Sequence, residues 1–391
     1  MIVESLGLGI GIYTLYRAAK DEYYNYKYLV EQLPAKNKSF TNAAGNKIKF
    51  INYKDNVIRL DIAGICGVDT VESQKDFLKS YFRVKDIEFT DNLNGKIDLK
   101  LIDNSKFEKN FEVIPQQEFE ILTGYKDYKP NLVNMNRFPN VLIGGDTGSG
   151  KSRFLMVLLS NLIANCPDVE LYFMQIRKSD LILFKDCKQC KYIARDLTKA
   201  RNLLKHINDL CIERDAIIEQ YTVSDGILNI EDYNRHFKNN KMKYVYLVLE
   251  EFSFFMPNGA DSKEEKQLKR EILGYIRQIV NSSRSVGVFT ITSLQKPTKD
   301  SIPTDIKSQL SVRVAFKLLD KENSIVILGN SSATKLKPLE AIIRTNNQSI
   351  VNIPLIHHKA IMRAIKEDIA TDKQYIELNE VENTNNEGVI E

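Results

Sequence analysis

Short apolar runs alternate with amphipathic helical stretches from about residue 138 onward. Five runs have the length and composition of buried strands: NVLIGG, VELYFMQI, YVYLVLEEF, GVFTITSL and VRVAFKLL. The stretches between them, such as LTKARNLLKHINDLCIERDAIIEQY, carry apolar residues at helical spacing. Strands that alternate with helices favour a parallel sheet with helices on its faces. We therefore predict an α/β fold with a mainly parallel central sheet flanked by helices.

The pattern before residue 120 is different. The run NVIRLDIAGI alternates as a strand does, and TVESQKDFLKSYF has helical spacing with Thr70 as its predicted N-cap. The run IEFTDNLNGKIDLKLID predicts a hairpin with Asn94-Gly95 at its tight turn. We expect a small α/β module over residues 23–118 and a larger domain over residues 119–367.

Two terminal segments stand apart from these domains. Residues 1–22 include the apolar run IVESLGLGIGIYTLY, which is shorter than the ~20 residues that a transmembrane helix needs and lacks the basic start of a signal peptide. The segment is either a membrane anchor, at the inner face of the cell membrane, or a buried or interfacial helix. Residues 368–391 form a polar, acidic tail whose end we expect to be disordered.

Composition is that of a soluble globular protein, and it excludes little. A net charge of +4 over 391 residues is too small to indicate nucleic-acid binding by bulk charge, so a polyanion would have to meet local patches. The five cysteines show no framework pattern, which suits a reducing cytosol. Cys187, Cys190, His206 and Cys211 could suggest zinc. However, the last two lie about 140° apart around a predicted helix, so we do not predict a zinc site.

The strongest chemical signal is the stretch GGDTGSGKSRF, which follows the apolar run VLIG and fits G-x-x-x-x-G-K-[ST]. Glycines let successive backbone N–H groups turn toward an anion, and Lys151 adds a mobile positive charge for the β- and γ-phosphates. The Ser152 hydroxyl can ligate Mg²⁺, and the following helix directs its positive end at the phosphates. We predict an ATP site formed by Gly145, Asp146, Thr147, Gly148, Ser149, Gly150, Lys151, Ser152 and Arg153.

A pair of acids ends the third apolar run, at Glu250 and Glu251. In a nucleotide-hydrolysing site the first acid supports Mg²⁺ through water and the second polarises the attacking water. We therefore predict Ser152 and Glu250 as metal residues and Glu251 as the catalytic base. The alternative is an exposed strand end that carries two acids.

The segment from about residue 120 to 345 resembles the FtsK/SpoIIIE family of hexameric DNA translocases. The resemblance is carried by FPNVLIGGDTGSGKS, by the run IKSQLSVRVAF and by single residues of the family pattern: Gly124, Arg284, Gly287, Gln295, Lys296, Pro297, Lys307 and Arg313. The run ENSIVIL aligns with an element that usually carries an arginine, where this chain has Ile325.

The resemblance implies a RecA-like P-loop NTPase fold, ATP hydrolysis, a homo-hexameric ring with sites at subunit interfaces, and double-stranded DNA in the pore. Gln295 is expected to sense the γ-phosphate through hydrogen bonding. Arg284 or Arg313 is the candidate arginine finger for a neighbour's ATP, and a structural ion pair is the alternative for each.

Contacts to DNA are expected from two stretches. MPNGADSKEEKQLKRE carries four basic residues and QIRKSD carries two: Lys263, Lys266, Lys269, Arg270, Arg177 and Lys178. They would touch phosphates without reading bases. Glu264 and Glu265 between them also fit an ordinary solvated helix face.

The sequence thus predicts an ATP-driven DNA translocase. Neither a multi-span N-terminal region nor room for a winged-helix domain is evident, which favours a coupling protein of a conjugative plasmid or integrative element. Such proteins deliver DNA and its relaxase to a secretion channel. The alternatives are a DNA pump for chromosome or plasmid segregation and a protein-secretion ATPase.

Overall fold

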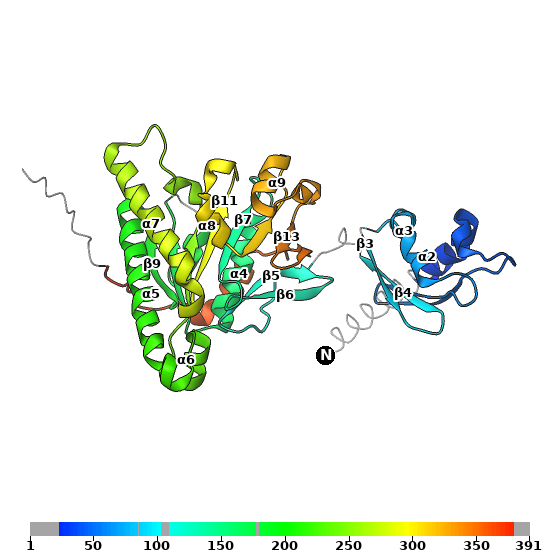
Figure 1. The fold of residues 1–391 in the computed structure, drawn as a ribbon, viewed down its shortest axis with the longest axis horizontal. Coiled ribbons are helices and arrows are strands. Elements are labelled where there is room, and N and C mark those ends of the chain that lie inside the picture. The colour runs from blue at the N-terminus through cyan, green and yellow to red at the C-terminus, as the bar shows by residue number, and fades with distance from the viewer. Residues whose placement is uncertain (1–22, 85, 103–108, 177–179, 379–391) are drawn as a thin grey trace, which may run out of the picture. The chain divides into compact units, whose positions relative to one another are not determined.

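The computed structural model describes residues 23–84, 86–102, 109–176 and 180–378 (Figure 1). The chain divides into two compact units, residues 1–107 and 108–391. No helix among the described residues is both long and apolar enough to span a membrane. The predicted apolar segment 1–22 lies outside them, so its membrane role stays a prediction.

The first unit contains a four-stranded antiparallel sheet with helices packed on it. Its elements are a helix over residues 23–36, η1 (Lys38–Phe40), β1 (Lys49–Lys54), β2 (Val57–Asp61), α2 (Val68–Ser73), α3 (Lys75–Phe82), β3 (Asp86–Asp91) and β4 (Lys96–Ile102). The strand order is β1-β2-β4-β3. The predicted hairpin is β3–β4, and Asn94 and Gly95 have the positive φ angles, 50° and 71°, that its tight turn requires.

The prediction that Thr70 caps a single helix is wrong. Thr70 lies inside α2, whose N-cap is Gly67, and a second helix, α3, begins after Gln74. Apolar side chains at helical spacing continue through both helices and pack into one core. The sequence pattern therefore does not reveal the break at Gln74.

The second unit is built on a ten-stranded sheet. Its strands are β5 (Glu120–Lys126), β6 (Lys129–Asn134), β7 (Asn140–Gly144), β8 (Glu170–Met174), β9 (Cys190–Ala194), β10 (Val245–Leu249), β11 (Val288–Leu294), β12 (Val312–Ala315), β13 (Glu340–Arg344) and β14 (Gln348–Asn352). The order is β6-β5-β14-β13-β12-β7-β11-β10-β8-β9. From β12 to β9 all neighbours pair in parallel, and the strands from β13 to β6 extend the sheet in antiparallel fashion.

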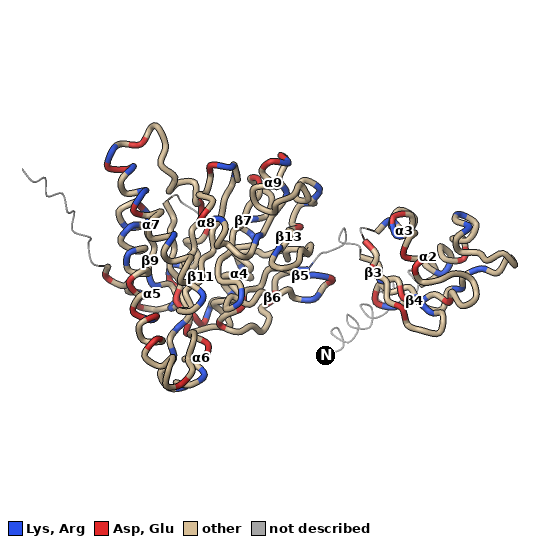
Figure 2. The backbone as a smooth tube through the Cα atoms, viewed as in Figure 1, with Lys and Arg blue, Asp and Glu red and all other residues tan. Residues whose placement is uncertain are grey.

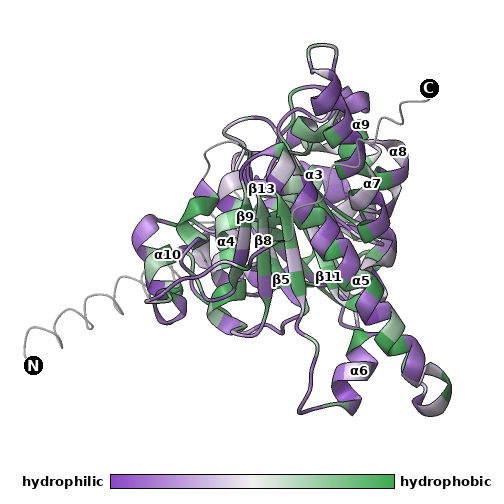
Figure 3. Ribbon diagram, turned by 90° about the vertical axis from the view of Figure 1, so that its left-hand side faces the viewer, coloured by the Kyte–Doolittle hydropathy of each residue, from purple (hydrophilic) through white to green (hydrophobic). Residues whose placement is uncertain are grey.

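Helices cover both faces of this sheet. They are α4 (Lys151–Asn165), α5 (Leu197–Asp225), α6 (Ile230–His236), α7 (Lys263–Val286), α8 (Thr304–Gln309), α9 (Lys321–Leu328) and α10 (His358–Ala364), with short turns η3 (Asp180–Phe184), η4 (Phe252–Phe255), η5 (Lys299–Ser301), η6 (Ser332–Lys335) and η7 (Lys366–Asp368). One core holds α4, η3 and α10 against the sheet, and a second holds α5, α7, α8 and α9. Hydrophobic residues concentrate on the strands and hydrophilic ones on the outer sides of α5 and α7 (Figure 3). The predicted α/β fold is confirmed.

A buried polar network holds the start of β7, below the predicted nucleotide site. Asn140 is 1% exposed. Its side-chain amide donates to the carbonyls of Val280 and Gln309, at 3.1 and 3.2 Å, and its Oδ1 accepts from the Thr290 hydroxyl at 2.9 Å. A buried amide is stable only when it is hydrogen-bonded in this way. The network therefore connects β7 with α7, α8 and β11.

The first part of the predicted tail lies along the edge of the sheet. Ile369 pairs with Cys187, and the Ile376 N–H donates to the carbonyl of Lys191 beside β9. Ile376 and Leu378 also pack against the second core. Residues 379–391, where we expect disorder, lie outside the described residues.

Gly287→Ala should lower the free energy of unfolding by about 1–3 kcal/mol. Gly287 ends α7 with φ +69°, and an added Cβ would lie 2.4 Å from Cδ1 of Ile230, which is buried. Gly274, inside the same helix, has open space around it. The control Gly274→Ala should therefore raise stability by about 0.5–1 kcal/mol. Denaturant unfolding compares the two variants, and equal stability would contradict the prediction.

Candidate nucleotide site

Three neighbouring parallel strands end at the candidate site. β7 leads into the glycine-rich loop, β11 ends just before Gln295, and β10 ends just before Glu250 and Glu251. Because the strands are parallel, their carboxyl ends meet at one edge of the sheet. Gln295 therefore stands between the loop and the acids.

The glycine-rich loop is shaped by positive φ angles and by a close wall. Gly148 and Gly150 have φ of +78° and +117°, which only glycine adopts at little cost. At Gly145 an added Cβ would lie 2.6 Å from Cβ of Phe316 and 2.7 Å from the Ser149 hydroxyl. Phe316 thus forms the wall behind the loop, and any side chain at Gly145 would displace the loop from it.

Asp146 fastens the loop to the segment that follows β12. Its N–H donates to the carbonyl of Lys317 at 3.1 Å, and its Oδ2 accepts from the Leu319 N–H at 2.8 Å. The apolar run VRVAFKLL predicts a strand through this region, yet β12 ends at Ala315. Phe316 to Leu319 leave the sheet and line the loop. The sequence analysis missed this wall, although Phe316 closes the run IKSQLSVRVAF that carries the resemblance.

Lys151 is a nearly buried cation, 8% exposed, at the first position of α4. Its amine donates to the backbone carbonyls of Gly145 and, at 3.0 Å, of Asp146. Burial lowers the pKa of Lys151, and the negative charges of Glu251 and Asp146 oppose that shift. The ammonium is therefore held inside the curve of the loop, where a phosphate of a bound nucleotide would sit.

Glu251 is fixed by two hydrogen bonds and is 7% exposed. Its Oε1 accepts from the Ser253 hydroxyl at 2.7 Å, and its Oε2 accepts from the backbone N–H of Gln295 at 2.8 Å. Ser253, which the sequence analysis missed, thus orients the predicted base. Glu250 is half-buried at the same strand end, and its N–H donates to the carbonyl of Met174 at 3.3 Å.

A cavity of about 230 Å³ opens over the loop. Gln295 and Leu339 line it together with most of the predicted loop residues: Asp146, Thr147, Gly148, Gly150, Lys151, Ser152 and Arg153. The structure therefore brings the predicted phosphate-binding residues and Gln295 to one cavity.

The two candidate arginines lie away from this cavity. Arg284 is exposed in the last turn of α7, beside the amino end of β11, which is the opposite edge of the sheet. Arg313 lies on β12, where its guanidinium donates to the carbonyl of Lys307 at the end of α8. Burial and the neighbouring charge of Arg344 lower the pKa of Arg313 to about 10. Arg313 therefore caps α8, and neither arginine reaches the loop of its own chain.

The first turns of α7, which follow the loop after η4, keep only part of the predicted basic surface. Acidic and basic residues alternate along α7 (Figure 2). Lys263 and Arg270 are exposed and Lys266 is half-buried. The prediction that Lys269 contacts DNA is wrong, because Lys269 forms an ion pair with Asp261 at 2.8 Å and both side chains are buried. Arg177 and Lys178 lie outside the described residues.

The FtsK/SpoIIIE family model matches residues 101–285 of this chain, which confirms the resemblance. DNA translocase FtsK of Leptospira interrogans is 27% identical over 289 residues, which cover 68% of this chain and 29% of that protein. DNA translocase FtsK of Chlorobaculum tepidum is 30% identical over 210 residues, which cover 51% of this chain and 24% of that protein. The chain thus spans less than a third of the length of these relatives.

Two solved structures share the fold. The pCW3 conjugation coupling protein TcpA, in a monomer form with ATPγS, has a TM-score of 0.61 at 19% identity, over 88% of this chain and 98% of that one. The type VII secretion ATPase EccC of Thermomonospora curvata has a TM-score of 0.52 at 18% identity, over 68% of this chain and 33% of that one. At these identities the likeness is one of fold, and it is to P-loop ATPases, the enzyme class that the sequence predicts.

Asp146→Ala should release the Leu319 amide and weaken nucleotide binding several-fold. Leu319 is 76% exposed, so its amide depends on the Asp146 carboxylate for protection from exchange. Asp146→Asn keeps an acceptor oxygen and is the matched control. Amide hydrogen exchange at Leu319 and ATPγS titration measure the two effects. Unchanged protection in the alanine variant would show that the carboxylate does not hold the segment.

Proposed function

We propose that this protein is an ATP-driven translocase of double-stranded DNA of the FtsK/SpoIIIE type, working as a homo-hexamer. The observation that carries the proposal is the meeting of Lys151, Glu251 and Gln295 at the ends of three adjacent parallel strands. The family match supports the choice of DNA as the substrate that is moved.

Three residues have separate roles in ATP binding and hydrolysis: Lys151, Glu251 and Gln295. On nucleotide binding the Lys151 amine exchanges the carbonyls of Gly145 and Asp146 for phosphate oxygens, which favour its charged form. The Glu251 carboxylate accepts a proton from the attacking water as the water oxygen bonds to the γ-phosphorus. The bond from that phosphorus to the bridging oxygen breaks in the same step, and ADP is the leaving group. Since the backbone N–H of Gln295 is bonded to Glu251, a shift of the Gln295 backbone toward the γ-phosphate would also move the base.

The donor set at this edge suits Mg²⁺, which prefers hard oxygen ligands. Ser152 presents an exposed hydroxyl that lines the cavity, and Glu250 offers a carboxylate at the neighbouring strand end. A bound Mg²⁺ would neutralise the charge that develops on the phosphates. Ser152 and Glu250 would hold it.

Translocation along DNA requires a neighbouring subunit and residues that bind the DNA backbone. Since Arg284 and Arg313 do not reach the loop of their own chain, either could act only on the nucleotide of another subunit, as a finger in trans. Lys263, Lys266 and Arg270 would hold the DNA backbone by charge, which gives a grip that is independent of sequence and sensitive to salt.

The biological setting that we propose is conjugative transfer, with a relaxase and secretion-channel proteins as partners and the segment 1–22 as a membrane contact. The fold shared with the conjugation coupling protein TcpA over 88% of this chain favours it. A segregation pump is the alternative within the family. Protein secretion is the alternative outside it, because the secretion ATPase EccC shares the fold.

Lys151→Ala should abolish ATP hydrolysis by removing the cation from the phosphate site. Glu251→Gln should keep binding but slow hydrolysis by about 10²–10⁴, because an amide cannot take the proton. The second variant therefore retains ATP, which filter binding with labelled nucleotide measures. Wild-type turnover in both variants would remove these assignments.

Duplex DNA should stimulate ATP hydrolysis, and the protein should displace a triplex-forming strand from linear duplex. Lys263→Gln with Lys266→Gln should weaken the stimulation and reduce the salt dependence of DNA binding by about one slope unit per lost contact. The charge-matched control is Lys238→Gln with Lys241→Gln. Both control residues are exposed in the loop before β10, at the other edge of the sheet. Turnover that duplex does not change would favour the secretion ATPase.

A further inference from the structure

A short structured segment joins the predicted base to the helix that carries the proposed DNA contacts. Glu251 is the N-cap residue of η4, and Ser262 is the N-cap residue of α7. Residues 252–262, which we call the η4 segment, therefore connect the hydrolysis site directly to the start of α7. Lys263 and Lys266 lie in the first turn of that helix.

Asp261 fastens one end of the η4 segment to α7. Its two carboxylate oxygens accept from the Lys269 amine, both at 2.8 Å, and the side chains of Asp261 and Lys269 are 9% and 8% exposed. The same oxygens accept from the backbone N–H and the side-chain amide of Asn258, both at 2.7 Å. A buried ion pair of this kind holds a fixed geometry, because the loss of either partner leaves a buried charge unpaired. The loop from Asn258 to Asp261 is therefore fastened to the second turn of α7.

The other end of the η4 segment is bonded to the base. The Ser253 hydroxyl donates to Oε1 of Glu251 at 2.7 Å, and the Ser253 carbonyl accepts from the N–H of Met256 at 3.2 Å. Phe252 and Phe255, on either side of this serine, are buried in the core that also holds α7. η4 packs against both α7 and β11. A shift of α7 against the sheet would therefore displace the Ser253 hydroxyl.

The carboxylate of Glu251 is shared between two different elements. Oε1 faces η4 through Ser253, and Oε2 accepts from the N–H of Gln295 at the end of β11, at 2.8 Å. β11 lies inside the sheet between β7 and β10, whereas η4 lies outside the sheet. A change in the position of η4 against β11 would therefore turn the carboxylate. A misplacement of ~1 Å at a reacting group is enough to change a rate by about 10²-fold.

We propose that the η4 segment couples contact with DNA at the start of α7 to the orientation of Glu251. Ser253 is the positioning residue at one end, and the ion pair between Asp261 and Lys269 transmits the displacement at the other. The inference rests on the proposed function, since it takes duplex DNA to bind at α7 and Glu251 to be the base. Lys269 then serves DNA-dependent hydrolysis from inside the protein, without touching DNA.

The first test removes the hydroxyl at the base. Ser253→Ala should lower the ratio of duplex-stimulated to basal ATP turnover to about one, because the carboxylate then keeps only its bond to Gln295. The KM for ATP should stay within about twofold of wild type, since the residues that line the phosphate cavity are unchanged. Ser253→Thr, which keeps a hydroxyl, should restore the ratio. Ser253 is exposed, so both variants should fold.

The matched control is Ser73→Ala in the first unit. The exposed hydroxyl of Ser73 also donates over 2.7 Å, to the carbonyl of Thr70, and has no link to the base. A merely structural role of Ser253 would lower basal and stimulated turnover by the same factor and leave their ratio unchanged. A wild-type ratio in Ser253→Ala therefore overturns the proposal.

The second test removes the ion pair. Asp261→Asn with Lys269→Met leaves no buried charge unpaired and keeps an acceptor oxygen for Asn258. This variant should bind duplex within about twofold of wild type, because Lys269 is buried, yet its stimulation ratio at saturating duplex should fall toward one. Lys263→Gln with Lys266→Gln should instead lose both duplex affinity and stimulation.

The outcomes distinguish this inference from the proposed function. If duplex does not stimulate the wild-type protein, the proposed function fails and the coupling fails with it. If duplex stimulates both the wild type and the ion-pair variant equally, the inference is wrong while the translocase stands. Weaker duplex binding by the ion-pair variant would show that Lys269 contacts DNA directly, which also overturns its assigned role. Should the ion-pair variant not fold, the comparison of Ser253→Ala with Ser253→Thr decides alone.

Discussion

The candidate nucleotide site depends on the position of one buried ammonium group, that of Lys151. Lys151 is 8% exposed, and a buried charge is costly unless opposite charge or hydrogen-bond acceptors surround it. Here the acceptors are the carbonyls of the loop itself, and the nearby negative charges are Glu251 and Asp146. Only one strand, β11, separates β10 from β7, and this order brings Glu251 to its position near Lys151. The parallel order of the three strands thus brings to Lys151 one of the negative charges that oppose the lowering of its pKa.

The conformation of the loop around Lys151 also depends on residues that are distant in the sequence. A Cβ on Gly145 would lie 2.6 Å from Cβ of Phe316, and the Leu319 amide is bonded to Asp146 across 173 residues. β12 pairs directly with β7, so its end necessarily arrives beside the loop. The same segment continues into α9. A change in the loop can therefore be transmitted to α9 through the backbone hydrogen bond from Asp146 to Lys317 and through the bond from the Leu319 amide to the Asp146 carboxylate.

The sequence revealed the strands and the phosphate loop because both signals are local. A strand buried on both faces is a continuous apolar run, and the glycines, Lys151 and Ser152 are adjacent in the chain. The wrong and missed predictions concern residues whose surroundings are set by contacts that are distant in sequence or follow no periodic pattern. Lys269 belongs to a basic stretch, yet its ion pair with Asp261 removes it from the surface. The wall at Phe316 and the hydrogen bond from Ser253 have no motif, since the sequence does not show which acceptor a side chain will face.

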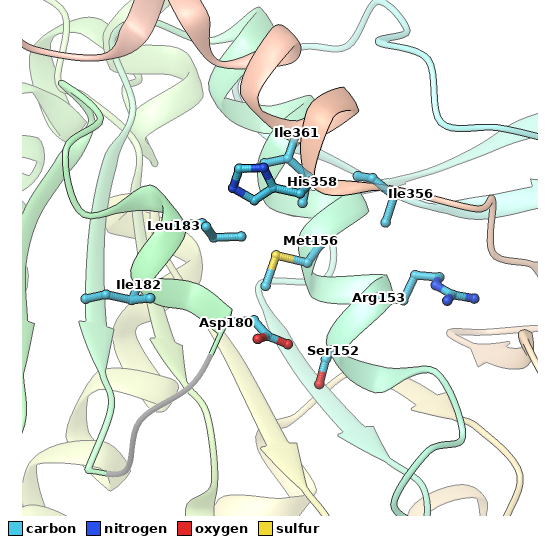
Figure 4. A pocket seen from close by; sticks show the side chains of 9 residues that line it. All are labelled: Ser152, Arg153, Met156, Asp180, Ile182, Leu183, Ile356, His358 and Ile361. Carbon is cyan, nitrogen blue, oxygen red and sulfur yellow. The ribbon is translucent and has the colours of Figure 1, made fainter.

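The same reasoning explains why a hollow of about 720 Å³ beside α4, which is lined by Met156, Ile182 and Ile361 among others, has no sequence signal (Figure 4). Its walls come from three segments of the chain, and each contributes side chains that alone are ordinary for a helix or a turn. They converge because η3 and α10 pack into the same core as α4, on the face opposite α5 and α7. The first turn of α4 then separates two spaces of different chemistry, one lined by backbone and a cation, the other by aliphatic side chains.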